Sequence, residues 1–304
     1  MRDADEIRAM LRGPVNATLT TFARDGALVA SGIRAVVERS IANGCRIIIL
    51  TWGDSLMSLL SDAEVLTVHR LVREAAGPDV LTVACDNLWG LPQSIEWART
   101  VRELGFDLYM ARPAEWLNAK GTPDSLADFY RAVAKEMRCM LVGNVPIKTC
   151  EMIANEANIV AFKEDAGPDY AHEIQMRWGD RWPLVGGGGF RGHHLIWPHG
   201  HCDAWMDLFI RTNAAPAWRY WEALQAGDGA AAWRVIEEFE VPYRALEARS
   251  LCGRASFKHA MLEVFGIAPR WLRSPAPSAT DGEVDQIRRL MHELGLLGDS
   301  PTAR

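Results

Sequence analysis

The sequence predicts an α/β protein: a closed (β/α)8 TIM barrel followed by a C-terminal helical extension. Short β-rich apolar runs recur roughly every 20 to 35 residues with helical patterns between them, which is typical of parallel βα units. Eight such units follow one another, as a closed barrel requires. The strand pattern stops at Gly227-Asp228-Gly229, after which only helical patterns remain. We therefore expect the barrel over residues 1–227 and the extension over residues 228–304.

The expected strands are short runs rich in β-branched and other apolar residues. They are Val15–Thr20, Arg46–Thr51, Val80–Ala84, Asp107–Met110, Cys139–Gly143, Ile159–Lys163, Pro183–Gly187 and Cys202–Trp205. The helices expected between and after them are Ile33–Ala42, Asp62–Ala76, Gln93–Leu104, Ser125–Met137, Tyr170–Trp178, Gly192–Trp197, Pro216–Ala226, Ala230–Ala248, Ser256–Phe265 and Glu283–Leu296. The link Thr149–Ala157 is short for a crossover helix. A doubly wound open sheet is the alternative fold, but its glycine fingerprint is missing after the first strand.

Composition argues against several classes of partner. The chain has 304 residues, 49% of them hydrophobic, which is enough for a well-buried core. Its net charge is -6 and it has no basic stripe, so we expect no nucleic-acid partner. No apolar run is long enough to span a bilayer, so we expect no membrane partner. The acidic N-terminus lacks a signal core and the six cysteines form no Cys-x-x-Cys pair, which favours a cytoplasmic protein with reduced thiols.

Lysine is scarce in this chain, with 5 lysines against 28 arginines. One of the five, Lys163, ends an apolar strand-like run. A guanidinium stays protonated, whereas a desolvated lysine amine can lose its proton and attack a carbonyl to form a Schiff base. A lysine that reaches from a strand end into solvent is the alternative interpretation. In a barrel, Lys163 would lie at the mouth, where catalytic residues gather.

Several short motifs follow one another along the chain. Each motif alone is a weak signal, but their order and spacing together are more specific for a protein family. Gly13–Thr20 is followed by Ile47–Ser55, then by Leu141–Pro146 and by Ile159–Glu164. The last positions of the series are Lys258, Gly266, Arg273 and Pro275. Together these motifs resemble the dihydrodipicolinate synthase and N-acetylneuraminate lyase family of class I, Schiff-base aldolases, over almost the full length of the chain.

The resemblance implies a lyase that uses no cofactor or metal and acts on pyruvate or a related 2-oxo acid. By position, Lys163 would form the imine, and Thr51 with the backbone around Trp52 would hold the substrate carboxylate. Asn144 would support the fifth-strand loop, and Gly187 would let the backbone come close to the substrate. A protonated imine is an electron sink, so cleavage of a C–C bond or loss of water beside it becomes accessible. The family also implies a homo-oligomer, either a tetramer or a dimer.

Other positions depart from the family pattern. The family's proton-relay tyrosine falls at Gly143, and its cross-interface tyrosine motif is replaced by Pro113-Ala114-Glu115. The second threonine of its Gly-Thr-Thr-Gly-Glu motif is Trp52, and the arginine that meets the distal carboxylate in the lysine-pathway enzyme is Lys148. These changes argue against the dihydrodipicolinate synthase reaction itself and suggest a reshaped pocket. Proton transfer would then use an ordered water or one of Asp86, Glu115 and Asp203.

Two further patterns suggest other chemistry. Four of the eight histidines lie between residues 193 and 201. If His199, His201 and Asp203 share an extended segment, they project to one face, as a metal site requires. A histidine-rich connector at the bottom of the barrel is the other interpretation. Gly186–Gly189 could cradle a phosphate, but no lysine, serine or threonine completes a P-loop, so a tight turn is favoured.

We therefore expect a Schiff-base-forming aldolase or dehydratase. A metal-dependent barrel hydrolase that uses the histidines is the alternative enzyme. A catalytically inactive homologue that binds a small acid or serves as a scaffold is the alternative outside enzymes, and the missing tyrosines favour it.

Overall fold

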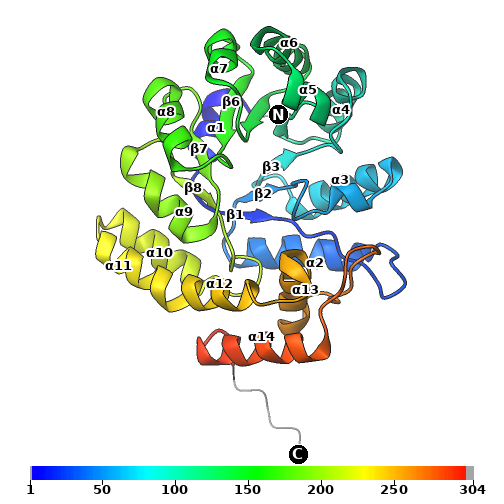
Figure 1. The fold of residues 1–304 in the computed structure, drawn as a ribbon, viewed down its shortest axis with the longest axis vertical. Helices are drawn as coiled ribbons and strands as arrows, with labels where there is room; N and C mark the ends of the chain where they lie inside the picture. Colours follow the sequence, from blue (N-terminus) through cyan, green and yellow to red (C-terminus); the bar gives the residue numbers. More distant parts are fainter. Residues whose placement is uncertain (1, 299–304) are drawn as a thin grey trace, which may run out of the picture.

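The computed structural model describes residues 2–298 and contains a closed barrel of eight parallel strands (Figure 1). Each strand pairs with the next one in sequence, and β8 (Ala204–Met206) closes on β1 (Gly13–Ala17). The predicted fold class is therefore confirmed. Met1 and residues 299–304, the last six of the expected extension, lie outside the described residues.

The strands lie close to their predicted positions but are mostly shorter. Their bounds are β2 (Ile47–Ile49), β3 (Leu81–Ala84), β4 (Leu108–Met110), β5 (Cys139–Val142), β6 (Ile159–Lys163) and β7 (Leu184–Gly186). Only β6 has the predicted bounds. The predicted bounds of β8 were wrong, because the strand begins and ends later than Cys202–Trp205. As a result Asp203 precedes β8, whereas Asp207 follows it at the mouth of the barrel.

Helices alternate with the strands and cover the outside of the barrel (Figure 1). They are α2 (Ala30–Ala42), α3 (Asp62–Ala76), α4 (Leu91–Glu103), α6 (Pro123–Ala134), α7 (Ile147–Ile153), α8 (Pro168–Trp178), α9 (Gly189–Ile196) and α10 (Ala215–Gln225), with 3-10 turns η1 (Met57–Leu59) and η2 (Trp197–His199). The short link after β5 does contain a helix, α7. Two helices were not predicted, α1 (Ala4–Met10) and α5 (Glu115–Lys120). Asp3 and Glu6 form a capping box at α1, which is a signal that the sequence contained.

The extension is entirely helical over its described residues. It consists of α11 (Gly229–Val235), a π-helical turn η3 (Ile236–Glu240), α12 (Val241–Glu247), α13 (Gly253–Val264) and α14 (Asp281–Glu293). The predicted helix Ala230–Ala248 thus corresponds to α11, η3 and α12 in series. Pro242 lies in the first turn of α12, where its missing N–H and its ring disrupt the regular helical ladder. Figure 1 places α12 and α13 beside the barrel, between α11 and α2.

The strands are buried on both faces, which explains why they read as apolar runs without alternation. Every residue of β1, β3, β5 and β6 is buried. Helices cover the outer face of a parallel barrel and side chains fill its interior, so neither face meets water. No helix among the described residues is both long and apolar enough to cross a membrane.

His69 joins α3 to the end of β3 inside this core. Its ring is fully buried between Trp97 and Phe106, with ring centroids 4.9 and 5.5 Å away. Its Nδ1 lies 2.7 Å from the Val65 carbonyl, and its Nε2 accepts from the Cys85 amide at 3.3 Å. Because Nε2 faces an N–H donor, the site fits a neutral imidazole. Burial accordingly lowers the pKa of His69 to about 4.

We expect the free energy of unfolding to fall as pH falls from about 6.5 to about 4, because unfolded His69 binds a proton there that the folded state does not. The depressed pKa corresponds to about 3 kcal/mol once the transition is complete. His69→Gln should remove this part of the pH dependence, as measured by urea unfolding near neutral pH and near pH 4.5. The control His199→Gln, at an exposed position, should keep the wild-type difference. An unchanged difference in His69→Gln would contradict the assignment.

Candidate active site

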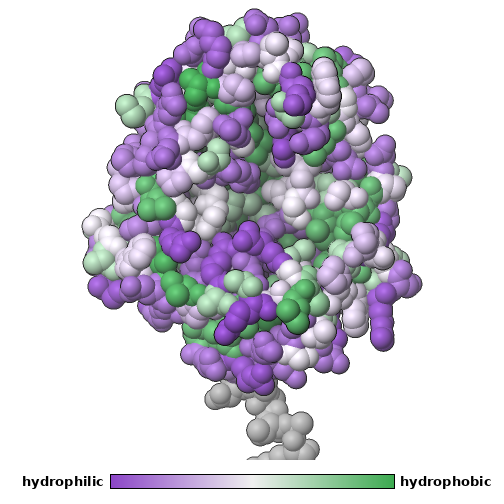
Figure 2. Space-filling model, in the orientation of Figure 1, coloured by the Kyte–Doolittle hydropathy of each residue, from purple (hydrophilic) through white to green (hydrophobic). Residues whose placement is uncertain are grey.

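The carboxyl ends of the strands surround a cavity of about 310 Å³. Lys163, the last residue of β6, lies in its wall with residues that follow β2, β4, β7 and β8. Figure 2 shows a hollow at the centre of one face, with hydrophilic side chains on the side where Figure 1 places α12 and α13. In barrels of this kind the strand ends carry the catalytic groups.

Lys163 presents a buried amine at this position. Its residue is 6% exposed, although it ends a strand. The backbone of Lys163 pairs with Val142 of β5 and Val185 of β7, which fixes where its side chain begins. Its Nζ lies 2.5 Å from Asp165 Oδ1, and the Asp165 side chain is 46% exposed. An enclosed amine and a partly hydrated carboxylate are thus close enough to exchange a proton directly.

The loop after β2 leaves backbone donors unpaired in the cavity wall. The Thr51 amide donates to Ser55 Oγ at 3.0 Å, and Thr51 Oγ1 accepts from the Asp54 amide at 3.0 Å. Within residues 2–298, the amides of Trp52 and Gly53 donate no hydrogen bond. Both residues line the cavity, as Thr51 does. Two N–H groups and a hydroxyl are therefore available here to hold a carboxylate.

The Trp52 indole is hydrogen-bonded to a buried carboxylate, that of Asp86. Its Nε1 donates to Asp86 Oδ1 at 3.2 Å, and Tyr109 donates its hydroxyl to Asp86 Oδ2 at 2.5 Å. Burial raises the pKa of Asp86 despite these hydrogen bonds. On its other side, Trp52 lies under the Arg112 guanidinium, 5.8 Å from the ring centroid. Asp86 lines neither this cavity nor its smaller neighbour, so its position does not suit the proton transfer considered for it.

Gly143 and Asn144 lie at a second cavity of about 260 Å³, which shares Trp52, Arg112 and Asp165 with the first. A Cβ added to Gly143 would meet no atom within 4 Å. Its φ of +73°, however, is a backbone conformation that residues with side chains rarely adopt. The Gly143 amide donates to the Lys163 carbonyl at 3.2 Å, so the backbones of the two residues are neighbours at the ends of β5 and β6.

Gly187 follows β7 in the wall of the larger cavity. A Cβ at this position would lie 2.5 Å from the Glu164 carbonyl oxygen, closer than real contacts allow. The lack of a side chain at Gly187 thus lets the segment after β6 come close, whereas a close approach of Gly187 to the substrate stays a prediction.

Three residues considered for the site lie elsewhere. Lys148 is on α7 with a 69% exposed side chain, and its Nζ pairs with Glu151 at 3.2 Å, so the structure does not bring it to either cavity. Glu115 begins α5, and 76% of its side chain is exposed. Asp203 lies before β8, where it pairs with Arg12 at 3.8 Å, because β8 starts later than predicted.

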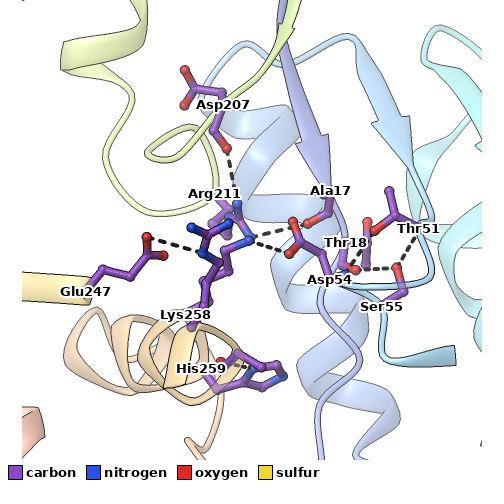
Figure 3. A network of polar contacts seen from close by, with 12 residues as sticks. Ala17, Thr18, Thr51, Asp54, Ser55, Asp207, Arg211, Glu247, Lys258 and His259 are labelled. Carbon is purple, nitrogen blue, oxygen red and sulfur yellow. Dashed lines mark hydrogen bonds and ion pairs between the residues drawn. The ribbon is translucent and has the colours of Figure 1, made fainter. Parts of the chain in front are cut away.

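Barrel and extension together supply one side of the larger cavity, which we call the polar wall: Asp54 and Arg211 of the barrel, and Arg244 and Lys258 of the extension. Figure 3 shows Asp54, Arg211 and Lys258 close to one another. Lys258 of α13 forms an ion pair with Asp54, across the interface between extension and barrel. Burial lowers the pKa of Lys258. Burial alone would raise the pKa of Asp54, but the charges of Lys258 and Arg211 outweigh it and hold this pKa below its ordinary value. Asp54 is therefore a carboxylate held between two cations.

The histidines do not form the extended metal face considered from the sequence. His199 ends the 3-10 turn η2, and His201 has a φ of +58°, so the two do not alternate along a strand. His193 is buried, with Nδ1 2.9 Å from the Tyr220 hydroxyl and Nε2 2.8 Å from the Cys202 carbonyl. Among residues 2–298, no three His, Cys, Asp or Glu side chains are grouped so as to hold a metal ion.

Sequence reasoning assigned no role to the residues of the polar wall or to Asp165. Arg211 follows β8, whose end was predicted too early. Lys258 carried a signal, because it is one of only five lysines. Nothing in the sequence indicated that it meets Asp54, 204 positions away.

Comparisons with known proteins agree with the resemblance seen in the sequence. Residues 10–197 match the dihydrodipicolinate synthetase family. An uncharacterized DapA-like lyase of Pyrobaculum neutrophilum is 23% identical over 94% of this chain and 99% of its own length. A probable 5-dehydro-4-deoxyglucarate dehydratase of Rhizobium meliloti is 24% identical over 94% of this chain and 97% of its own length.

Solved structures share the fold. The dihydrodipicolinate synthase of Oceanobacillus iheyensis superposes with a TM-score of 0.84 at 16% identity, covering 97% of this chain and all of that one. The N-acetylneuraminate lyase of Mycoplasma synoviae gives a TM-score of 0.81 at 17% identity, covering 95% and 99%. Because the family match spans more than half of the chain and the same barrel recurs in these structures, the chain belongs to the dihydrodipicolinate synthetase family of lyases, as a divergent member.

Proposed function

We propose that this protein is a Schiff-base-forming lyase, an aldolase or a dehydratase, that acts on pyruvate or a related 2-oxo acid. The observation that carries the proposal is that one cavity contains both the buried amine of Lys163 and unpaired backbone N–H groups that can bind a carboxylate. The family match supports lyase chemistry. The relatives named above include a probable dehydratase and a synthase, so both reaction types occur among similar proteins.

In the proposed reaction, the amides of Trp52 and Gly53 and the Thr51 hydroxyl hold the carboxylate of the 2-oxo acid. Lys163 Nζ then attacks the neighbouring carbonyl carbon, which forms a C–N bond. The carbonyl oxygen takes up protons and leaves as water, so that a protonated imine remains. This imine accepts the electron pair released when a C–C bond beside it breaks or when a proton beside it is removed.

We propose that Asp165 moves the protons in place of the missing tyrosine. It is the carboxylate in contact with Lys163 Nζ, and it lines both cavities. Its partial exposure lets it exchange protons with water, unlike the buried Asp86. Relocating this function from β5 to the end of β6 would leave the space at Gly143 for bulky substrate atoms.

For the nucleophile, we expect Lys163→Arg to fold normally and to form no adduct, because arginine keeps the charge without a nucleophilic amine. Borohydride reduction in the presence of pyruvate, followed by intact and peptide mass measurement, tests this. Lys148→Arg is the matched control and should be trapped as the wild type is, since Lys148 is exposed on α7. An adduct on Lys258, or one that survives in Lys163→Arg, would overturn the assignment. Wild-type protein that traps no 2-oxo acid would favour the inactive homologue.

For the proton transfer, we expect Asp165→Asn to slow imine formation by roughly 10²- to 10⁴-fold, because a placed acid–base group contributes about that much. The mass of the final adduct should not change. Stopped-time borohydride trapping measures the rate. Asp180→Asn, whose carboxylate is 95% exposed and remote from the cavity, is the control. A rate within twofold of wild type would refute the role.

We also propose that the protein works in the cytoplasm as a homo-oligomer, a tetramer or a dimer. The six free cysteines support the first point. Trp116 supports the second, because it is 74% exposed on α5, directly after the Pro113-Ala114-Glu115 segment. Light scattering at micromolar concentration should show a dimer or larger species, and Trp116→Lys should shift it toward smaller ones while Trp116→Phe should not. A wild-type monomer would contradict this proposal.

A further inference from the structure

Arg211 is a buried cation whose charge has no partner of its own. It is 4% exposed and lines the cavity that contains Lys163. Its guanidinium donates only to backbone carbonyls, to Asp207 at 3.1 Å and to Ala17 at 3.4 Å. Its Nε has no hydrogen-bond partner. No carboxylate of the described residues lies within 4.0 Å of it, whereas the neighbouring cations of the polar wall are paired.

A buried guanidinium in this state is costly, because burial removes its water and weak contacts to carbonyls replace that water poorly. The nearest acids do not offset the charge. Asp54 is already paired with Lys258. The Asp207 carboxylate accepts hydrogen bonds from Trp205 Nε1 and from two backbone amides, and Arg211 bonds only the backbone carbonyl of Asp207. The open side of Arg211 is the cavity itself.

We propose that Arg211 binds a second carboxylate of the substrate, in the same cavity as the donors of Trp52 and Gly53. The substrate class is then a 2-oxo acid with a carboxylate at its far end. A planar guanidinium offers two parallel donors to a carboxylate, and Arg211 is the cation of the polar wall that has no carboxylate partner among the described residues. This inference rests on the proposed function for the position of the first carboxylate. The site is not that of Lys148, which lies on the outer surface.

Two matched ligands test the proposal in the wild-type protein. 2-Oxoglutarate and 2-oxopentanoate have the same carbon chain and differ only in the terminal carboxylate. We expect half-maximal borohydride trapping at about 10- to 100-fold lower concentration of 2-oxoglutarate, the usual effect of hydrogen bonds to a charged group. In Arg211→Met this ratio should fall close to one, and in Arg211→Lys it should be partly kept. Arg34→Met removes a partly exposed arginine outside the cavity and should keep the wild-type ratio.

A second measurement separates this inference from the proposed function. Glutarate cannot form an imine, so its binding to the wild-type protein, compared with pentanoate by calorimetry, reports on the carboxylate subsite alone. Glutarate binding that depends on Arg211, without trapping of any 2-oxo acid, would leave the subsite intact and refute the lyase. Equal trapping of the two 2-oxo acids by the wild type would refute the subsite and leave the lyase.

Three other results would also overturn the inference. If inorganic phosphate binds more tightly than glutarate, the group that Arg211 recognises is a phosphate and not a carboxylate. If Arg211→Met loses as much trapping of pyruvate as of 2-oxoglutarate, Arg211 holds the first carboxylate and not the second. If Arg211→Met does not fold, Arg211→Lys decides: a ratio lower than that of the wild type supports the site, and a ratio unchanged from that of the wild type rules it out.

Discussion

The ion pair between Lys258 and Asp54 joins the two parts of the chain on which the site depends. Asp54 belongs to the loop after β2, and its backbone amide is bound by Thr51 Oγ1. Lys258 comes from α13 of the extension. Because most of each side chain is shielded, with 11% of Lys258 and 22% of Asp54 exposed, loss of either would leave a poorly solvated, unpaired charge, which is more destabilising than the intact pair is stabilising. The pair therefore holds the loop that leaves the amides of Trp52 and Gly53 open, and it holds α13 against the cavity.

Two of the positions at which the sequence departs from the family pattern lie at the mouth of the barrel. At the end of β5 stands Gly143, in a left-handed conformation, and after β2 stands the indole of Trp52. The indole is not loosely placed, because Asp86 and Arg112 fix it from two sides. The chain thus combines the barrel of its family with a glycine and a fixed indole near Lys163. Function in such a fold resides in the strand-end groups, and the barrel constrains them only in position.

Local patterns predicted the barrel well, because each βα unit carries its own apolar run and helical period. Lys163 was found because it ends such a run, and β6 has the predicted bounds. The end of β8 was misplaced because Cys202 and Trp205 both suit a strand, and only pairing with β1 and β7 sets its register. Lys148 was chosen from spacing alone, and the seven-residue helix α7 turns it outward. The contacts of Arg211 and Lys258 join distant segments, so no local pattern contains them.

The position of Lys258 in the chain also bears on biosynthesis. The last strand of the barrel ends at Met206, and Lys258 follows about fifty residues later. At ordinary translation speeds of roughly 5 to 20 residues per second, the ribosome makes all eight strands several seconds before it makes the helix that meets Asp54. A nascent barrel would carry the amine of Lys163 while the loop acid Asp54 still lacks its partner. Completion of the cavity is therefore a late event in synthesis, and a prematurely terminated chain would contain Lys163 without one wall of its pocket.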